Sequence, residues 1–156
     1  MPKPSSILAT LIGQTVSHVW RGHGSAIFVE FGKLTNSALL RNSATGHPRG
    51  EACLMIEWGW RIERPRSILG GAWSSERRWP GMFKQMIGNQ VAEVEVIGRL
   101  PEIVISLNNG LRVMSMMMDA GQPMWAVLTP HGNVCVKRGA LCVESTETSV
   151  SAHHNN

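Results

Sequence analysis

The side chains near the start of the chain that are best suited to catalysis are two histidines and a glutamate. His18 and His23 stand five residues apart across a predicted turn, and Glu30 follows in the next predicted strand. Imidazole and carboxylate groups can act as general bases and acids or bind a metal ion. A metal site needs three or four converging ligands, and the chain has no HExxH or CxxC motif. We expect no metal and no other cofactor, and a small-molecule pocket around these three residues is our third hypothesis.

Other nucleophile and phosphate motifs are incomplete. The serine in GHGSA precedes a predicted strand, whereas a nucleophile elbow requires a following helix. The LGG sequence at 69–71 lacks the lysine and hydroxyl of a Walker motif. Cys135 and Cys142 are predicted to be small apolar side chains on hairpin strands. Most glutamates occupy alternating strand positions predicted to face water: Glu30, Glu51, Glu57, Glu63, Glu93, Glu95 and Glu102. We therefore expect no catalytic residue and predict that the protein is not an enzyme.

Tryptophan supplies most of the aromatic surface, with six tryptophans and no tyrosine in the chain. Trp58 and Trp60 share one strand face with aliphatic residues, which predicts that both lie in the core. The segment AWSSERRWPG interleaves Trp73 and Trp79 with arginines. Such a segment can anchor a protein interface or stack on nucleic-acid bases, or the tryptophans can simply cover the core.

The elements that would position these residues are repeated along the chain. LIGQTVSHVW, from Leu11, and MIGNQVAEVEV, from Met86, match at an offset of 75 positions, and the following strands match after one inserted residue. A self-match of this kind indicates a reused supersecondary unit. Each copy reads as a short helix, a terminating glycine and β-strands, with Ser5 or Ser6 as the first helix cap. We therefore predict an internal duplication.

The remaining pattern predicts antiparallel strands. EACLMIEWGWRIE, at 51–63, alternates apolar and charged residues and is predicted to be one strand with one wet face. Residues 33–50 are polar, have no equivalent in the second copy, and are predicted to be a long surface loop, with or without a short strand. The predicted fold is α+β, mainly antiparallel β, built as a barrel or a sandwich from two repeated helix-plus-meander halves.

Composition indicates one globular domain. Apolar residues make up 43% and charged residues 17% of the 156 residues, the net charge is +4 and the pI is about 9.4. We predict a single domain at 1–145, with a pseudo-repeat of about 5–64 and 79–128, and a disordered tail at 146–156. Three unpaired cysteines, no signal sequence and no membrane-length apolar run indicate a cytoplasmic protein.

The order of motifs resembles a family of small bacterial domains of unknown function. The resemblance rests on L-I-G-x-x-V, F-x-E-F-G, W-x-W-R-I-E, a second I-G-x-x-V, N-G and a late tryptophan, across roughly residues 8–128. Members are similar to immunity proteins encoded beside polymorphic or contact-dependent toxins. The resemblance implies a protein that binds and blocks a cognate bacterial toxin, and it implies no catalytic residue.

We therefore expect a non-enzymatic, immunity-type protein, monomeric or dimeric, with a protein partner. Affinity in such interfaces comes from a few aromatic and arginine side chains, and charge complementarity sets partner choice. The residues expected to bind the partner are Glu57, Arg61, Glu63, Trp73, Arg77, Arg78, Trp79, Glu93 and Glu95. The alternative is a nucleic-acid-binding protein that uses a basic surface containing tryptophan and arginine.

Overall fold

The computed structural model describes residues 2–36, 46–119 and 125–145, and these residues form antiparallel strands with little helix. The predicted disordered tail and the middle of the 33–50 loop lie outside the described residues. The helical elements are α1 (Pro4–Ala9), the 3₁₀ turn η1 (Glu76–Arg78) and α2 (Trp79–Met86). The strands are β1 (Val16–Arg21), β2 (Ile27–Phe31), β3 (Ala52–Ile56), β4 (Trp60–Glu63), β5 (Ile68–Gly71), β6 (Val91–Ile97), β7 (Glu102–Leu107), β8 (Arg112–Ser115), β9 (Trp125–Thr129), β10 (Gly132–Lys137) and β11 (Ala140–Glu144).

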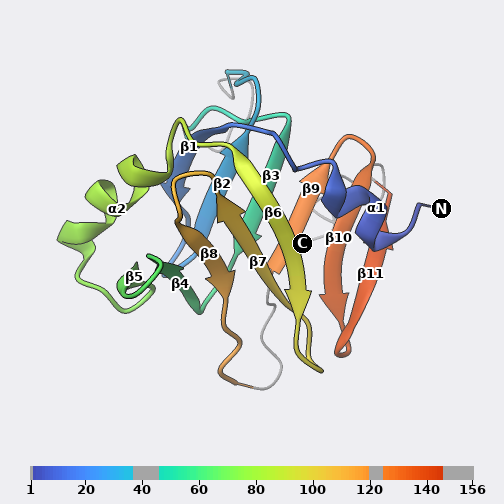
Figure 1. The fold of residues 1–156 in the computed structure, drawn as a ribbon. Coiled ribbons are helices and arrows are strands. Elements are labelled where there is room, and N and C mark those ends of the chain that lie inside the picture. The colour runs from blue at the N-terminus through green and yellow to red at the C-terminus, as the bar shows by residue number, and fades with distance from the viewer. Residues whose placement is uncertain (1, 37–45, 120–124, 146–156) are drawn as a thin grey trace.

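The strands are divided between two sheets (Figure 1). The six-stranded sheet has the order β1-β2-β3-β9-β10-β11, and the five-stranded sheet has the order β5-β4-β8-β7-β6. Each sheet therefore combines strands from early and late parts of the chain, with β9 beside β3 and β4 beside β8. The predicted α+β class with a dominant antiparallel sheet is confirmed at this level.

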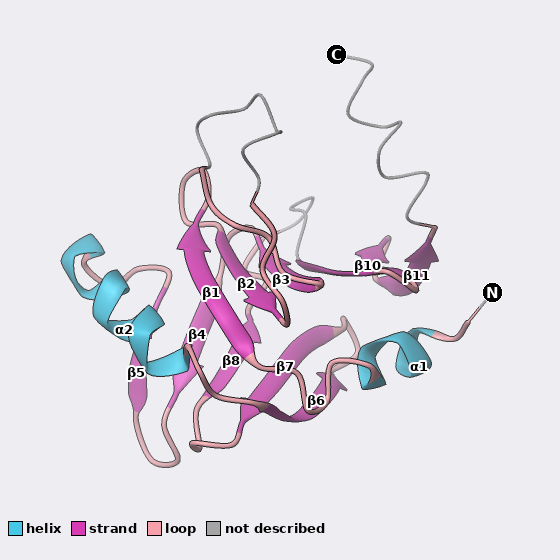
Figure 2. Cartoon of the chain, turned by 90° about the horizontal axis from the view of Figure 1, so that it is seen from above, coloured by secondary structure: helices cyan, strands magenta, loops and turns pink. Residues whose placement is uncertain are grey.

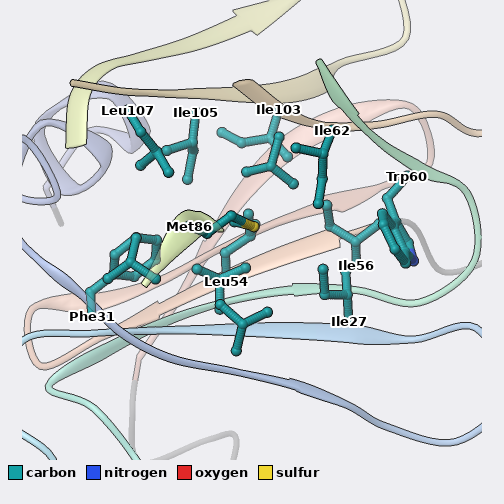
Figure 3. Packing of buried hydrophobic residues seen from close by; sticks show 14 of the residues in the cluster. Ile27, Phe31, Leu54, Ile56, Trp60, Ile62, Met86, Ile103, Ile105 and Leu107 are labelled. Atoms are coloured by element: carbon teal, nitrogen blue, oxygen red, sulfur yellow. The ribbon is translucent and has the colours of Figure 1, made fainter. Parts of the chain in front are cut away.

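The two sheets face each other across one apolar core (Figure 3). Leu54 and Ile56 of the six-stranded sheet and Ile62 and Ile105 of the five-stranded sheet are each at most 1% exposed. Because side chains alternate along a strand, the residues between these positions point away from the core. Each sheet therefore has an outer face, and these two faces carry the charged and polar side chains described below.

The helices lie at opposite sides of the molecule (Figure 1). Helix α2 packs against β1 and β5, and α1 packs against β10 and β11 (Figure 2). Helix α1 begins after Lys3 with Pro4 in its first turn, so the predicted Ser5 or Ser6 cap is wrong. Proline suits this position because its missing N–H would have no helical partner. No helix in the described segments has the length and apolar character needed to cross a membrane.

The segment between α1 and β1 crosses the segment between α2 and β6, and the two are hydrogen-bonded to each other. Gly13 N donates to Val91 O at 2.8 Å, and Gly88 N donates to Val16 O at the same distance. Gly13 and Gly88 have φ angles of +86° and +89°, a region that side chains with a Cβ disfavour. The two hydrogen bonds connect the starts of β1 and β6, one strand from each sheet.

Two buried tryptophans hold the hairpin turns. Trp60 Nε1 donates to Ser25 O at 2.7 Å, and Trp125 Nε1 donates to Pro101 O at 3.0 Å. Both indole side chains are 2% exposed. Each bond ties the first residue of a strand to the turn of a hairpin in the opposite sheet, β1–β2 for Trp60 and β6–β7 for Trp125.

The prediction of one strand at 51–63 is wrong, because β3 and β4 belong to different sheets. The chain turns between them at 57–59, where Ser25 Oγ donates to Trp58 O at 2.9 Å and Gly59 O accepts from Met116 N at 2.8 Å. Trp58 lies in this turn and is 51% exposed, so its predicted place in the core is also wrong. Alternation predicted the buried face correctly on both strands and failed only in the turn between them, where Trp58 lies.

Candidate functional site

Matching rows of residues cross the outer faces of the two sheets. A row here is a set of cross-strand partners, one residue from each strand. In the six-stranded sheet one row is His18, Glu30, Cys53, Leu128, Asn133 and Glu144. In the five-stranded sheet the corresponding row is Glu93, Ser106, Arg112, Glu63 and Ile68. A hollow lies along each row.

The hollow on the five-stranded sheet is the larger and is lined by arginines. It measures about 970 Å³ and is lined by Glu63, Arg64, Arg66, Glu93, Ser106 and Arg112, among others. We call it the arginine hollow. Arg64 and Arg66 project from the β4–β5 turn, which Arg64 N closes by donating to Ser67 O at 2.8 Å. Arg112 enters from β8, so the three guanidinium groups come from two separate elements.

Among the described residues, these arginines form no ion pair with a carboxylate. The ion pairs among the described residues are Arg21–Glu76, Arg61–Glu63 and Lys137–Glu144, so Arg64, Arg66 and Arg112 take no part in one. Glu63 is already held by Arg61, at 2.8 Å. Arg64, Arg66 and Arg112 are also exposed to solvent. The hollow therefore presents three exposed guanidinium groups that take no part in an ion pair among the described residues.

Beside the arginines, β6 supplies two neighbouring carboxylates. A hydrogen bond with Glu95, and then the negative charge of Glu95, raise the pKa of Glu93 above its ordinary value, and Arg112 acts in the opposite direction. Glu93 is fully exposed, so water weakens these effects. The face is thus basic toward the β4–β5 turn and acidic along β6.

The hollow on the six-stranded sheet is smaller and has an acid at its centre. It measures about 310 Å³ and is lined by Glu30, Arg49, Glu51, Cys53 and Asn133, among others. Glu30 is 1% exposed. Burial raises its pKa, while a hydrogen bond from the Cys53 thiol, the charge of Arg49 and the Gly50 N–H oppose that rise. Its Oε2 atom has no hydrogen-bond partner, and Trp20 Nε1 lies near the carboxyl without hydrogen-bond geometry. The prediction that Glu30 faces water is wrong.

The end of the 33–50 loop covers part of this second face. His47 Nδ1 and His18 Nε2 share a hydrogen bond of 2.9 Å, and the His47 ring stacks on Trp20 with a centroid separation of 4.8 Å. Burial, and then the charge of His47, lower the pKa of His18. Arg49 follows two residues later and approaches Glu30. In this hollow the chain itself supplies the cation for its buried acid.

The three residues suspected of forming a small-molecule site are only partly brought together. His18 and Glu30 are cross-strand partners, but His18 does not line the hollow beside Glu30. His23 lies in the β1–β2 turn and is exposed. Within the described ranges, no three His, Cys, Asp or Glu side chains are placed to hold a metal ion.

The residues predicted to bind a partner separate into two groups and one isolated residue. Arg61, Glu63, Glu93 and Glu95 gather on the outer face of the five-stranded sheet. Glu57 lies in the turn between β3 and β4. The other four residues lie in or beside η1, at the opposite end of β5 from the arginine hollow: Trp73, Arg77, Arg78 and Trp79.

Within this second group the surroundings differ sharply. Trp73 is 78% exposed, and Arg77 is also exposed. Trp79 is only 4% exposed and packs edge-on against Trp60, with ring centroids 5.1 Å apart, so its prediction as a surface anchor is wrong. Arg78 Nη2 donates to Leu69 O at 2.7 Å and thereby fastens η1 to β5. Trp79 is buried because it opens α2, the helix that covers the edges of β1 and β5.

Sequence reasoning missed the arginine hollow. RIERPR was recognisable as the densest basic run of the chain, but nothing local placed Arg112 beside Arg64 and Arg66. The burial of Glu30 had a weak signal, because Phe28, two residues earlier on the same face of β2, and its cross-strand partner Trp20 are both aromatic. An outer strand face rich in aromatic residues indicates that something covers it.

The chain was also compared with known proteins. No protein-family model, no curated protein and no solved structure matches it.

Proposed function

We propose that this is an immunity-type protein that binds a partner protein, a bacterial toxin, through the outer face of the five-stranded sheet. The observation that carries the proposal is the gathering of Arg61, Glu63, Glu93 and Glu95 beside the three arginines of the hollow, which form no ion pair in the described part of the chain. Exposed charges that the fold does not use for its own stability are available for recognition.

The position of the helices supports this choice of face. Helix α1 packs against β10 and β11 of the other sheet, and α2 packs at the β5 edge and against β1. The central strands β4, β8 and β7 therefore keep a solvent-facing side. The alternation of basic and acidic residues there suits selection of a partner by charge complementarity, which acts on association rate and specificity more than on affinity.

The choice of a toxin as partner rests on the motif resemblance described above. The net charge of +4 favours a partner that is acidic where it docks. Inhibition would come from covering the toxin's working surface, and no chemistry on this chain is required.

We further propose that the chain consists of two repeats that exchange strands. The bond from Gly13 N to Val91 O and the bond from Gly88 N to Val16 O are related by the same shift of 75 positions. Trp60 and Trp125 bond to turn residues 25 and 101, which the sequence alignment also equates. Each half would build a three-stranded meander and pass its later strands to the sheet of the other half.

The test is protection of cells against the toxin. A protein that is captured with this chain in its native host should be toxic when expressed alone, and the wild-type chain should remove the toxicity. The double variant E93K/E95K should fail to protect. The matched variant E51K/E76K makes the same change in net charge away from this face and should protect fully. Equal protection by both variants would exclude this face as the binding surface.

A nucleic-acid-binding function is the second candidate, because Trp73 and Arg77 are both exposed near η1. This function predicts oligonucleotide affinity that falls steeply as the salt concentration rises. Loss of that affinity in Trp73→Ala, with no loss in Trp58→Ala, would support it. Absence of binding to single- and double-stranded oligonucleotides at low salt would exclude it.

A further inference from the structure

We propose that the arginine hollow binds an acidic polypeptide segment, in which two or more Asp or Glu carboxylates meet Arg64, Arg66 and Arg112. This inference rests on the proposed function, because it names the chemistry of the partner at the same face. The occupant is a stretch of another protein chain, recognised chiefly by its carboxylates.

The first support is the state of the three arginines. A guanidinium group presents donors in a planar fork that matches a carboxylate, and two parallel hydrogen bonds can form at once. None of the three has an ion-pair partner within the described residues. An isolated exposed ion pair contributes little, but several charges converging on one concave site act together.

The second support comes from comparing the two hollows. In the six-stranded sheet, Glu30 and Cys53 are cross-strand partners, and Arg49, from a segment that lies over this face, approaches the acid. In the five-stranded sheet the corresponding partners are Ser106 and Arg112. The one hollow contains an acid and a cation supplied by the chain. The other contains three arginines and two carboxylates, of which Glu63 is paired with Arg61 and Glu93 is exposed, so the arginines outnumber the acids that are available to them.

The size and rim of the hollow suit a peptide. Its volume of about 970 Å³ lies near the upper end of the range for ligand pockets, about 300–1,000 Å³. Ile68 lines it and is 58% exposed, which offers an apolar contact beside the charges. Ser106 Oγ, also in the lining, is buried without a hydrogen-bond partner. A peptide can satisfy an apolar and a polar contact together with the arginines.

The same surroundings disfavour a nucleic acid. Glu63 and Glu93 line the hollow, and Glu95 lies two residues further along β6, so an uninterrupted run of phosphates would pass acidic groups. The exposed tryptophans that could stack on bases, Trp58 and Trp73, do not line the hollow. A peptide, by contrast, can place a lysine against Glu93 and Glu95.

The test measures binding of fluorescein-labelled hexaglutamate by fluorescence anisotropy at low ionic strength. The variant R64E/R66E reverses two charges in the hollow, and the milder R64Q/R66Q removes them. The matched control R99E/R138E reverses two exposed arginines in the β6–β7 and β10–β11 turns, with the same net change as R64E/R66E. We expect the control to bind as the wild type does, R64Q/R66Q to bind more weakly, and R64E/R66E to bind at least tenfold more weakly.

Two outcomes would overturn the inference. Equal weakening in R64E/R66E and R99E/R138E would mean that only net charge attracts the peptide. Tighter binding of a fluorescein-labelled dodecathymidylate than of hexaglutamate, lost in R64E/R66E, would make the hollow a nucleic-acid site. The proposed function fails separately. If hexaglutamate does not bind but E93K/E95K abolishes protection against the toxin, the inference is wrong and the proposed function stands.

Discussion

Alanine substitution at three glycines tests the backbone geometry where the segments leading into β1 and β6 cross, because the structure predicts opposite signs for the same chemical change. Gly13 and Gly88 have positive φ angles, and a Cβ atom at either position would meet nothing within 4 Å. Gly81 has equally open surroundings but lies within helix α2. Steric clashes therefore contribute to none of the three, and only the backbone conformation differs.

The magnitudes follow from that difference. A left-handed backbone costs a residue with a Cβ about 1–2 kcal/mol. Loss of glycine freedom in the unfolded chain returns about 0.4–1 kcal/mol. Gly13→Ala and Gly88→Ala should each lower the free energy of unfolding by about 1 kcal/mol. Gly81→Ala should raise it by about 0.5–1 kcal/mol, because alanine favours a helix.

Urea unfolding of the three variants, followed by tryptophan fluorescence, measures these differences. In a chain of 156 residues, 1 kcal/mol corresponds to a shift in melting temperature of about 2–4 °C. If Gly13→Ala or Gly88→Ala is neutral or stabilising, that residue does not adopt a left-handed conformation, and the backbone geometry described for the crossing is wrong. A destabilising Gly81→Ala would refute the helical assignment in the same way.

Three further predictions concern Glu30, Cys135 and Trp125. Burial raises the pKa of Glu30 above 4.5, so its stabilising contribution is complete at low pH and is lost as pH rises through the raised value. Glu30→Gln should therefore become more stable relative to the wild type as the pH rises from about 4 toward about 8. A difference in unfolding free energy that does not change with pH would contradict this. Burial raises the pKa of Cys135 to about 11, so its alkylation by iodoacetamide should be slow at neutral pH and should accelerate up to that pH; a plateau near pH 8.5 (about the ordinary thiol value) would disprove it. Trp125→Phe removes the hydrogen bond to Pro101 O and should lower the free energy of unfolding, measured by calorimetry, by roughly 2–4 kcal/mol. A decrease of less than about 1 kcal/mol would mean that this hydrogen bond contributes little to stability.

Local pattern predicted the elements better than their placement. The order of a short helix, a glycine and β-strands in each copy was predicted from periodicity and turn residues. Trp60 was correctly placed in the core, whereas Trp58, two residues earlier, was not. Both lie on one face of an ideal strand, so the error comes from the change of sheet between β3 and β4.

The candidate site was predictable in part. Arg61, Glu63, Glu93 and Glu95 could be selected because alternation places them opposite buried aliphatic residues. Trp79 could not be separated from Trp73, because each stands beside arginines or polar residues and only packing distinguishes a buried ring from an exposed one.

The sequence by itself determined two short helices, the alternating strands and the basic turn that contains Arg64 and Arg66. These features depend on residues within a few positions of one another, through backbone preference and side-chain periodicity. A glycine directly follows the C-cap of α2 as expected, whereas α1 is capped at Thr10, so the predicted termination of the first helix by a glycine is wrong. Only the tertiary structure decided that β4 pairs with β8 and β9 with β3, that Arg112 joins the basic turn, and that Glu30 is buried under the 46–50 segment. Those outcomes depend on pairing between distant segments, and the register and covering of a sheet are set by packing that no local stretch of residues encodes.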